Sequence, residues 1–232
     1  MTHSLYLLDV EGTVAPISLV YEQLFPYARK RFAEFLKQNG SDAAVHADLA
    51  LLAEENLADA DAPRMDGGAD GAVAYLHWLM DRDRKSTALK SLQGRIWKTG
   101  FETGALKGTL FADVPAALER WAKHGRTAIY SSGSADAQRL LFRYSSFGDL
   151  TGRIAAYFDT RTGAKTDSAS YVAIAAAMGV EPAQVMFLSD VVRELDPARE
   201  AGLATRLVVR AGNAPVAEGH GHAVIDSFDD IA

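Results

Sequence analysis

The sequence predicts an α/β fold with a doubly wound parallel sheet, into which a helical domain is inserted. Short runs of consecutive apolar residues alternate with amphipathic helical segments, a pattern typical of strands that are buried on both faces of a parallel sheet. Polar or acidic clusters follow three of these runs, at the strand ends where such sheets bind ligands. With 232 residues, the chain is long enough for one such domain and a sizeable insertion.

The first predicted strand covers residues 5–8 and runs directly into Asp9. This apolar run is too short for a signal peptide or a membrane-spanning helix. The segment of residues 20–108 then departs from the alternation and carries mostly helical patterns. We therefore predict a Rossmann-like catalytic core of residues 1–19 and 109–232, with residues 20–108 forming a helical cap.

Helical patterns within the predicted cap begin with one amphipathic helix that starts near Pro26 and ends before Gly40. A stretch rich in Gly, Asp and Ala, residues 59–71, predicts a loop. Further helices are predicted over residues 72–81 and 87–99.

The rest of the core is predicted from the same alternation of apolar runs and helical segments. In chain order, the elements are a helix over 114–123, a strand over 127–130, a helix over 168–178 and strands over 185–188 and 207–209. Between the last two strands, Asp196 is expected to cap a short helix that has Pro197 as its first residue and ends before Gly202.

The composition argues against several kinds of partner. The chain has 24 basic and 30 acidic residues, a net charge of -6, whereas nucleic acids and anionic membranes require a basic face. A small anionic substrate requires a few local cations and remains compatible. The chain has no cysteine, which excludes a disulfide framework and thiolate metal sites. We expect a cytoplasmic protein.

The acidic cluster after the first strand has residues that suit phosphoryl transfer. The carboxylate of Asp9 could attack a phosphorus atom if cations offset the charge repulsion. The carboxyl group of Glu11 could protonate the leaving oxygen and then activate water, while Gly12 permits a sharp turn. A turn with two solvated acids is the alternative, and this cluster by itself leaves both interpretations open.

The segment from Asp9 to Thr13 resembles the first motif of the haloacid dehalogenase superfamily phosphatases, with a glutamate at position 11 in place of the second aspartate. Ser131, Lys165 and Asp190 match the second, third and fourth motifs in order. Longer matches resemble the enolase-phosphatases of methionine salvage, of which the glutamate at position 11 is a mark. They comprise Pro16-Ile17, Leu24-Phe25-Pro26-Tyr27, Leu92-Gln93-Gly94 with Trp97, Phe111-Ala112-Asp113-Val114, Tyr130-Ser131-Ser132-Gly133-Ser134, Phe158-Asp159-Thr160, Val209-Arg210 and Gly212-Asn213.

This resemblance implies a role for each matching residue. Asp9 is expected to be the nucleophile that forms an aspartyl-phosphate, and Glu11 the acid and base. Lys165 is expected to neutralise both the phosphate and the nucleophile. One Mg²⁺ ion is expected to be held by Asp9, Asp190 and the backbone carbonyl of Glu11. The phosphate-binding residues implied are Ser131, Ser132, Gly133 and Lys165.

Other interpretations of three side chains stay open from the sequence. Ser131 could cap a helix that begins near Ala135, and Lys165 could be a solvated loop residue. Glu194 could reach the surroundings of the metal, or it could pair with Arg193 or Arg199.

The resemblance also implies an activity. Enolase-phosphatases convert 2,3-diketo-5-methylthiopentyl-1-phosphate to an acireductone and inorganic phosphate, and the cap closes over the substrate and excludes water. The expected partner is therefore a small phosphorylated molecule, with no nucleic acid and no membrane, and the family implies a monomer. A sugar-phosphate or nucleotide phosphatase of relaxed specificity is the first alternative. A catalytically silent binding module is the second.

Overall fold

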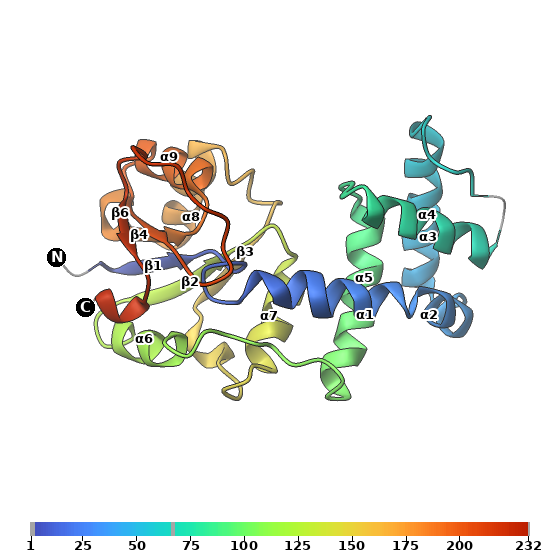
Figure 1. The fold of residues 1–232 in the computed structure, drawn as a ribbon, viewed down its shortest axis with the longest axis horizontal. Helices are drawn as coiled ribbons and strands as arrows, with labels where there is room; N and C mark the ends of the chain where they lie inside the picture. The colour runs from blue at the N-terminus through green and yellow to red at the C-terminus, as the bar shows by residue number, and fades with distance from the viewer. Residues whose placement is uncertain (1–2, 66–67, 232) are drawn as a thin grey trace. The chain divides into compact units, whose positions relative to one another are not determined.

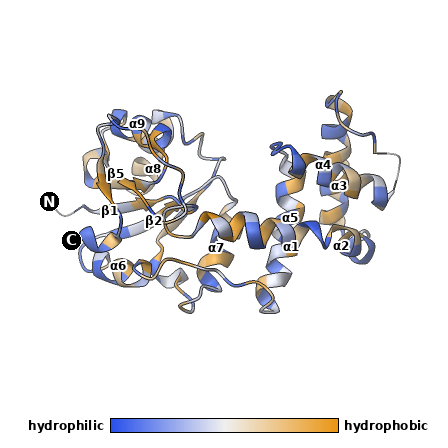
Figure 2. Cartoon of the chain, in the orientation of Figure 1, coloured by the Kyte–Doolittle hydropathy of each residue, from blue (hydrophilic) through white to orange (hydrophobic). Residues whose placement is uncertain are grey.

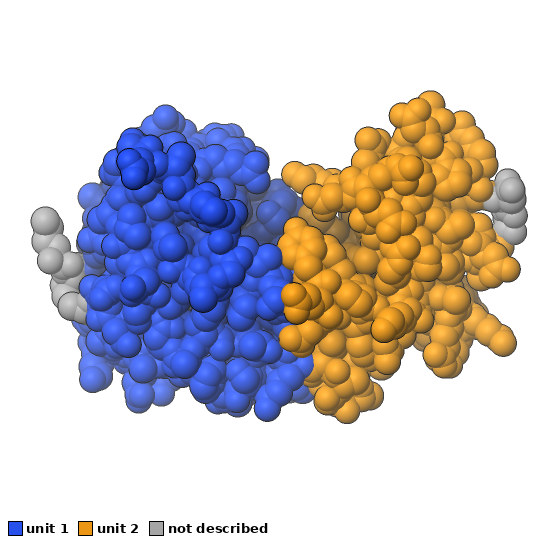
Figure 3. Space-filling model, in the orientation of Figure 1, with its two compact units in different colours: residues 1–20, 107–232 blue, residues 21–106 orange. Residues whose placement is uncertain are grey.

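The computed structural model describes residues 3–65 and 68–231, and its secondary structure is shown in Figure 1. The chain forms two compact units, which Figure 3 shows in different colours. Unit 1 comprises residues 1–20 and 107–232, and unit 2 comprises residues 21–106. Among the described residues, no helix is both long enough and apolar enough to span a bilayer.

Unit 1 is built on a six-stranded sheet with the strand order β3-β2-β1-β4-β5-β6, in which every neighbouring pair is parallel. The strands are β1 (Leu5–Leu8), β2 (Arg126–Tyr130), β3 (Ala156–Phe158), β4 (Val185–Ser189), β5 (Ala204–Val208) and β6 (Ala223–Ile225). The predicted parallel α/β sheet is thus confirmed. Strand β1 pairs with β2 on one side and β4 on the other, and Leu8 is level with Ile129 and Leu188. Asp9 therefore follows an inner strand, between the ends of its two neighbours.

Helices cover both faces of this sheet. The four α-helices of unit 1 among the described residues are α6 (Val114–Trp121), α7 (Ala135–Arg143), α8 (Ser168–Ala177) and α9 (Val192–Glu200). Alternate strand residues such as Leu7 and Phe187 share one apolar core with α8 and α9. Tyr6 points to the opposite face, where its ring stacks on Trp121 of α6 with 4.4 Å between centroids. Figure 2 shows the strands as predominantly apolar, as burial on both faces requires.

Short helical turns complete unit 1. These are a π-helical segment (Leu19–Leu24) that crosses the boundary between the units, and three 3₁₀ turns (Thr151–Arg153, Pro182–Gln184 and Phe228–Asp230).

The helix predicted to start at Pro197 is wrong in its start, because α9 already begins at Val192 and contains Pro197 in its interior. Asp196 does not cap this helix; its carboxylate pairs with Arg199 at 2.7 Å. Burial of Leu195 against the sheet explains the earlier start, because the packed apolar face outweighs the hydrogen bond that proline cannot donate.

Two strands at the edges of the sheet, β3 and β6, were not predicted. Each has only three residues, and most of these are partly or fully exposed. The strand predicted over residues 207–209 is displaced, since β5 spans Ala204–Val208. Half-buried and buried positions alternate at the start of this strand, so a search for continuous apolar runs misses its first residues.

Unit 2 is helical among its described residues. Its helices are α1 (Phe25–Arg29), α2 (Phe32–Asn39), α3 (Ala43–Ala58), α4 (Ala69–Asp81) and α5 (Thr87–Glu102). The segment predicted to form a single helix before Gly40 forms two, α1 and α2, and Ala28, Phe32 and Leu36 of these helices are buried in one core. The predicted loop over 59–71 is shorter at its C-terminal end, because α4 begins at Ala69. Residues 66–67 of that loop lie outside the described residues.

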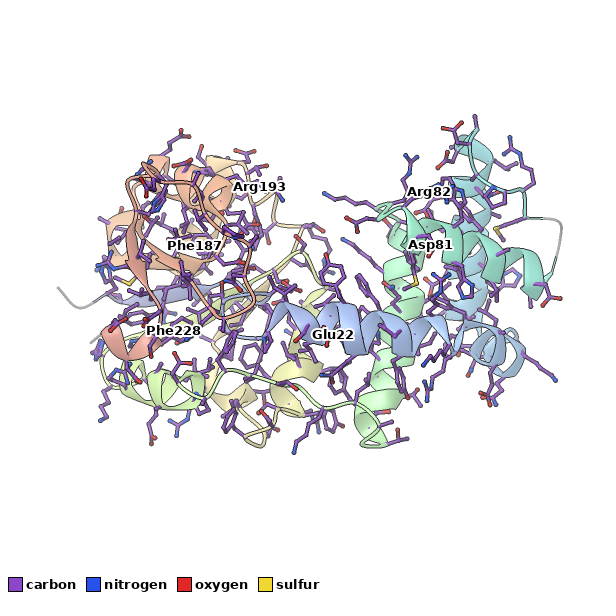
Figure 4. All side chains as sticks on the ribbon, in the orientation of Figure 1. Glu22, Asp81, Arg82, Phe187, Arg193 and Phe228 are labelled. Atoms are coloured by element: carbon purple, nitrogen blue, oxygen red, sulfur yellow. The ribbon has the colours of Figure 1, made fainter. Side chains whose placement is uncertain are left out.

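An ion pair on the surface of unit 2 joins the ends of two of its helices. Asp81, labelled with Arg82 at the end of α4 in Figure 4, pairs with Arg29 of α1 at 2.7 Å. Arg82 lies over the ring of Trp78, with its guanidinium carbon 4.6 Å from the ring centroid. These contacts are solvent-exposed and contribute little to stability compared with the apolar core of the unit.

Candidate active site

A buried cluster of one lysine and two carboxylates lies at the carboxyl end of the sheet. The Lys165 ammonium donates to Asp9 Oδ1 at 2.5 Å and also pairs with Glu194 Oε2 at 2.5 Å. The side chains of Lys165, Asp9 and Glu194 are only 7%, 5% and 12% exposed. Asp9 comes from the end of β1, Glu194 from the first turn of α9 and Lys165 from the loop before α8.

Burial and charge act in opposite directions on Lys165. Burial alone lowers the pKa of this amine, but the charges of Asp9 and Glu194 outweigh it and raise the pKa well above its usual value. The ammonium is therefore a permanent positive charge at the end of β1. Its loop is fixed by the Tyr171 hydroxyl, which lies 2.7 Å from the carbonyl oxygen of Lys165 and 2.9 Å from that of Glu194.

Asp190 follows β4 and faces the same cluster. Burial, followed by the negative charge of Asp9, raises its pKa to about 7. Its backbone N–H donates to the Thr13 hydroxyl at 3.1 Å, which joins the loop after β1 to the loop after β4. Gly12 has φ of +75°, and a Cβ atom there would collide with the Asp190 carboxylate. Both the backbone conformation and this close approach therefore require glycine at position 12.

Glu11 connects the loop after β1 with the loop after β2. Its carboxylate accepts a hydrogen bond from the Ser131 hydroxyl at 3.2 Å. Burial and the charge of Asp9 raise the pKa of Glu11, which favours its protonated form. The Ser131 hydroxyl oxygen also accepts from the backbone N–H of Gly133 at 3.1 Å, whereas Ser132 is exposed.

The loop after β2 leads into α7, and two polar side chains for which no role was predicted fix its shape. Gln138 donates to the carbonyls of Gly133 and Phe158, at 2.8 and 2.9 Å. Asp159, after β3, accepts from the N–H of Ala135 at 3.1 Å. The cap of α7 is Ser134, whose hydroxyl accepts from Ala137, so capping this helix does not require Ser131. Asp159 had a signal in the sequence, because it follows an apolar pair like the other strand-end acids.

The donors present are compatible with one divalent cation. Four carboxyl groups lie here, those of Asp9, Glu11, Asp190 and Glu194, and among the described residues Lys165 forms ion pairs with two of them, Asp9 and Glu194. Asp190 Oδ1 is buried without a hydrogen-bond partner, an arrangement that a bound cation would compensate.

The described part of the chain contains no group of three or more His, Cys, Asp or Glu side chains arranged to hold a metal ion. Asp9 and Asp190 would therefore be supplemented by a backbone carbonyl and water. Mg²⁺ suits such a donor set, because it typically keeps several waters beside one or two carboxylates.

The structure brings Asp9, Glu11, Ser131, Lys165 and Asp190 to one end of the sheet. The interpretation of Lys165 as a solvated loop residue is wrong, since its side chain is buried in two ion pairs. Among the described residues, Glu194 pairs with Lys165 rather than with Arg193 or Arg199, and its carboxylate also accepts from the Ser189 hydroxyl at 3.1 Å.

This chain is similar to several known proteins over nearly its whole length. The family model of the haloacid dehalogenase-like hydrolases matches residues 3–202. An enolase-phosphatase E1 of Synechococcus elongatus is 52% identical over 229 residues, which cover 97% of this chain and 96% of the relative. An enolase-phosphatase E1 of Leptospira borgpetersenii is 43% identical over 233 residues, with 100% and 99% covered. The crystal structure of the UTR4 protein of Saccharomyces cerevisiae has a TM-score of 0.81 and 37% identity, covering 98% of this chain and 99% of that one.

Proposed function

Because this chain belongs to the haloacid dehalogenase-like hydrolases and, among them, to the enolase-phosphatases, we propose that it converts 2,3-diketo-5-methylthiopentyl-1-phosphate to an acireductone and inorganic phosphate. Asp9 is the proposed nucleophile. The observation that carries this proposal is the buried ion pair of Asp9 with Lys165 at 2.5 Å. An ammonium at this place offsets the repulsion between the Asp9 carboxylate and an incoming phosphate.

The phosphoryl transfer proceeds in two displacements. A carboxylate oxygen of Asp9 attacks phosphorus, the bond from phosphorus to the substrate oxygen breaks, and Glu11 gives its proton to that oxygen. Water then attacks the phosphorus of the aspartyl-phosphate, its bond to Asp9 breaks, and Glu11 takes the proton of the water. The raised pKa of Glu11 is in the direction that this role requires, because burial and the charge of Asp9 make its carboxylate a stronger proton acceptor.

Enolisation comes before the loss of phosphate. A proton leaves the carbon next to a carbonyl group, and the carbonyl oxygen gains a proton from solvent. Glu11 in its ionised form is the proposed base for this step, because a carboxylate can accept a proton whereas the raised pKa of Lys165 keeps its ammonium protonated. The proton taken from carbon then supplies the leaving oxygen, and Glu11 returns to its starting state when it releases the proton of the attacking water to solvent. Hydrogen–deuterium exchange at the substrate carbon tests this assignment, and unchanged exchange in Glu11→Gln would contradict it.

Asp9, Asp190 and the Glu11 carbonyl are the proposed donors for one Mg²⁺ ion. When bound, this ion would offset the charge of the phosphate and polarise a substrate oxygen. The proposed phosphate-binding groups are the Ser131 hydroxyl, the backbone around Ser132 and Gly133, and the Lys165 ammonium. Hydrogen-bond donors and an ammonium are the groups that bind phosphate oxygens well.

Unit 2 is the proposed cap domain, and unit 1 is the proposed catalytic core. If unit 2 takes part in enclosing the substrate, amide hydrogen exchange in residues 21–106 should slow when a phosphate analogue binds. Unchanged exchange throughout these residues would contradict the assignment.

Phosphorus NMR on the diketo phosphate, with Mg²⁺ and with a chelator, tests the proposed activity. The wild-type protein should release inorganic phosphate when Mg²⁺ is present, and Asp9→Asn should release none while remaining folded. Appreciable release by Asp9→Asn would refute the assignment of the nucleophile. Equal efficiency on p-nitrophenyl phosphate would point instead to a phosphatase of relaxed specificity.

A further inference from the structure

Two side chains from the segment after β5 hold the loop that follows the proposed nucleophile. The amide nitrogen of Asn213 donates to the carbonyl oxygen of Gly12 at 3.0 Å. The Nε of Arg210 donates to the carbonyl oxygen of Thr13 at 3.3 Å. These carbonyls are consecutive, so the two donors together fix the two peptide groups on either side of Thr13.

Arg210 is itself held firmly. Its side chain is 6% exposed and pairs with Asp113 at 2.8 Å, and it also donates to the Asp226 carbonyl at 2.9 Å. The guanidinium carbon lies 4.6 Å from the ring centroid of Phe111 and 4.7 Å from that of Phe228. Phe228 is labelled on the C-terminal 3₁₀ turn in Figure 4. Because these contacts leave the Arg210 side chain little rotamer freedom, its guanidinium is a rigid hydrogen-bond donor.

The loop that these donors hold determines where two catalytic acids lie. The Val10 carbonyl accepts from the N–H groups of residues 13, 14 and 15, and Gly12 N–H donates to the Ala15 carbonyl at 2.8 Å. Asp9 immediately precedes this turn. The hydroxyl of Thr13 in turn accepts from the N–H of Asp190. A shift of the turn would therefore move both Asp9 and Asp190.

We propose that Asn213 and Arg210 are positioning residues for phosphoryl transfer, which act by fixing the turn of residues 10–15. This inference rests on the proposed function of the site. Neither residue touches the proposed reacting atoms. Their effect should appear in the rate of the chemical step, because small displacements of a nucleophile reduce the fraction of bound substrate that is aligned for attack.

Asn213→Ala tests the proposal with Asn39→Ala as its matched control. Asn39 is also partly exposed and donates to a backbone carbonyl, that of Phe35, at 2.9 Å. The two variants should lose similar amounts of thermal stability. In Asn213→Ala, kcat should fall about tenfold with KM changed less than about twofold, since loss of one hydrogen bond can shift the barrier by about 1.4 kcal/mol. Asn39→Ala should keep both constants.

Arg210→Lys adds a second test, because lysine keeps the charge but lacks the planar set of donors. Combined with Asn213→Ala, it should lower kcat by less than the product of the two single effects, since both side chains hold one turn. An unchanged kcat in Asn213→Ala, or a raised KM with unchanged kcat, would overturn the proposal. So would fully multiplicative effects in the double variant.

Amide hydrogen exchange separates a failure of this inference from a failure of the proposed function. If the wild-type protein does not hydrolyse the diketo phosphate, the proposed function fails and the kinetic test lapses with it. Exchange at Gly12 and Ala15, whose N–H groups are both bonded within the turn, should still be faster in Asn213→Ala than in Asn39→Ala. Equal exchange in the two variants would overturn the positioning role whatever the activity.

Discussion

Replacing Asp113 with asparagine would remove the charge that opposes the buried guanidinium of Arg210. Asp113 Oδ2 accepts from Arg210 at 2.8 Å, from the Ser227 hydroxyl at 3.2 Å and from the Phe228 N–H at 2.7 Å. The side chains of the pair are 10% and 6% exposed. One carboxylate therefore joins the residue before α6, the segment after β5 and the C-terminal 3₁₀ turn.

The expected cost follows from this burial. Removing one partner of a buried ion pair typically costs about 3–5 kcal/mol, because the other charge stays buried without compensation. Asparagine keeps the shape and one acceptor oxygen, so we expect the lower end, about 3 kcal/mol. For a chain of this length, such a loss lowers Tm by about 6–12 °C.

The stabilisation that the Asp113 carboxylate provides should also depend on pH. Burial alone would raise the pKa of Asp113, but the hydrogen bonds from Arg210 and from the Phe228 N–H outweigh it and lower the pKa. Because the pKa of the folded state lies below that of the unfolded state, this stabilisation is present above about pH 4 and is lost as the pH falls through the folded value. The difference in unfolding free energy between wild type and Asp113→Asn should therefore be constant from pH 7 down to about pH 4 and shrink below it.

Urea unfolding of both proteins across this pH range measures the difference. Asp136→Asn is a suitable control, because Asp136 is exposed and pairs with Arg139 at 3.2 Å on the surface; it should unfold like the wild type. An Asp113→Asn protein as stable as the wild type at pH 7 would contradict a stabilising role for the buried ion pair. So would a difference that grows on acidification.

Three further predictions concern the site. Lys165→Met should lower kcat at least about a hundredfold, because Asp9 and its neighbours would lose their ammonium. Glu194→Gln should lower kcat less. Steady-state kinetics compares the two variants, and equal losses of kcat would contradict the direct role of Lys165. Gly12→Ala should destabilise the fold and reduce activity, because its Cβ would collide with the Asp190 carboxylate. Gly179→Ala is the control, since Gly179 also has a positive φ but lies in open space, and this variant should cost only the backbone strain of about 1 kcal/mol. Thermal unfolding of both variants measures the difference, and equal losses of Tm would be evidence against a collision at position 12. Treatment with a chelator should abolish phosphate release and added Mg²⁺ should restore it, as a colorimetric phosphate assay can follow; undiminished release without metal would contradict the proposed cofactor.

Much of the fold is encoded locally, in patterns that can be read along the chain. The runs that became β1, β2 and β4 are continuously apolar because both of their faces are covered, and each is followed by a polar side chain: Asp9, Ser131 and Asp190. The rule that ligands bind at the carboxyl ends of parallel strands then places these residues together. The edge strands β3 and β6 escape such reasoning because they are only three residues long, too short for an apolar run to distinguish a strand from other structure.

Burial and backbone preference leave local patterns along the chain, and these patterns predict the type of sheet, the inserted helical segment and the polar residues that follow the strands. Three features could be found only in the folded chain: Glu194 pairs with Lys165, α9 continues through Pro197, and Asn213 and Arg210 hold the turn after Asp9. These outcomes depend on which loops meet in space, and side chains far apart in sequence leave no periodic signal of their contact. Which partner a side chain contacts depends on how whole helices and strands pack, so its charge and type do not by themselves identify that partner.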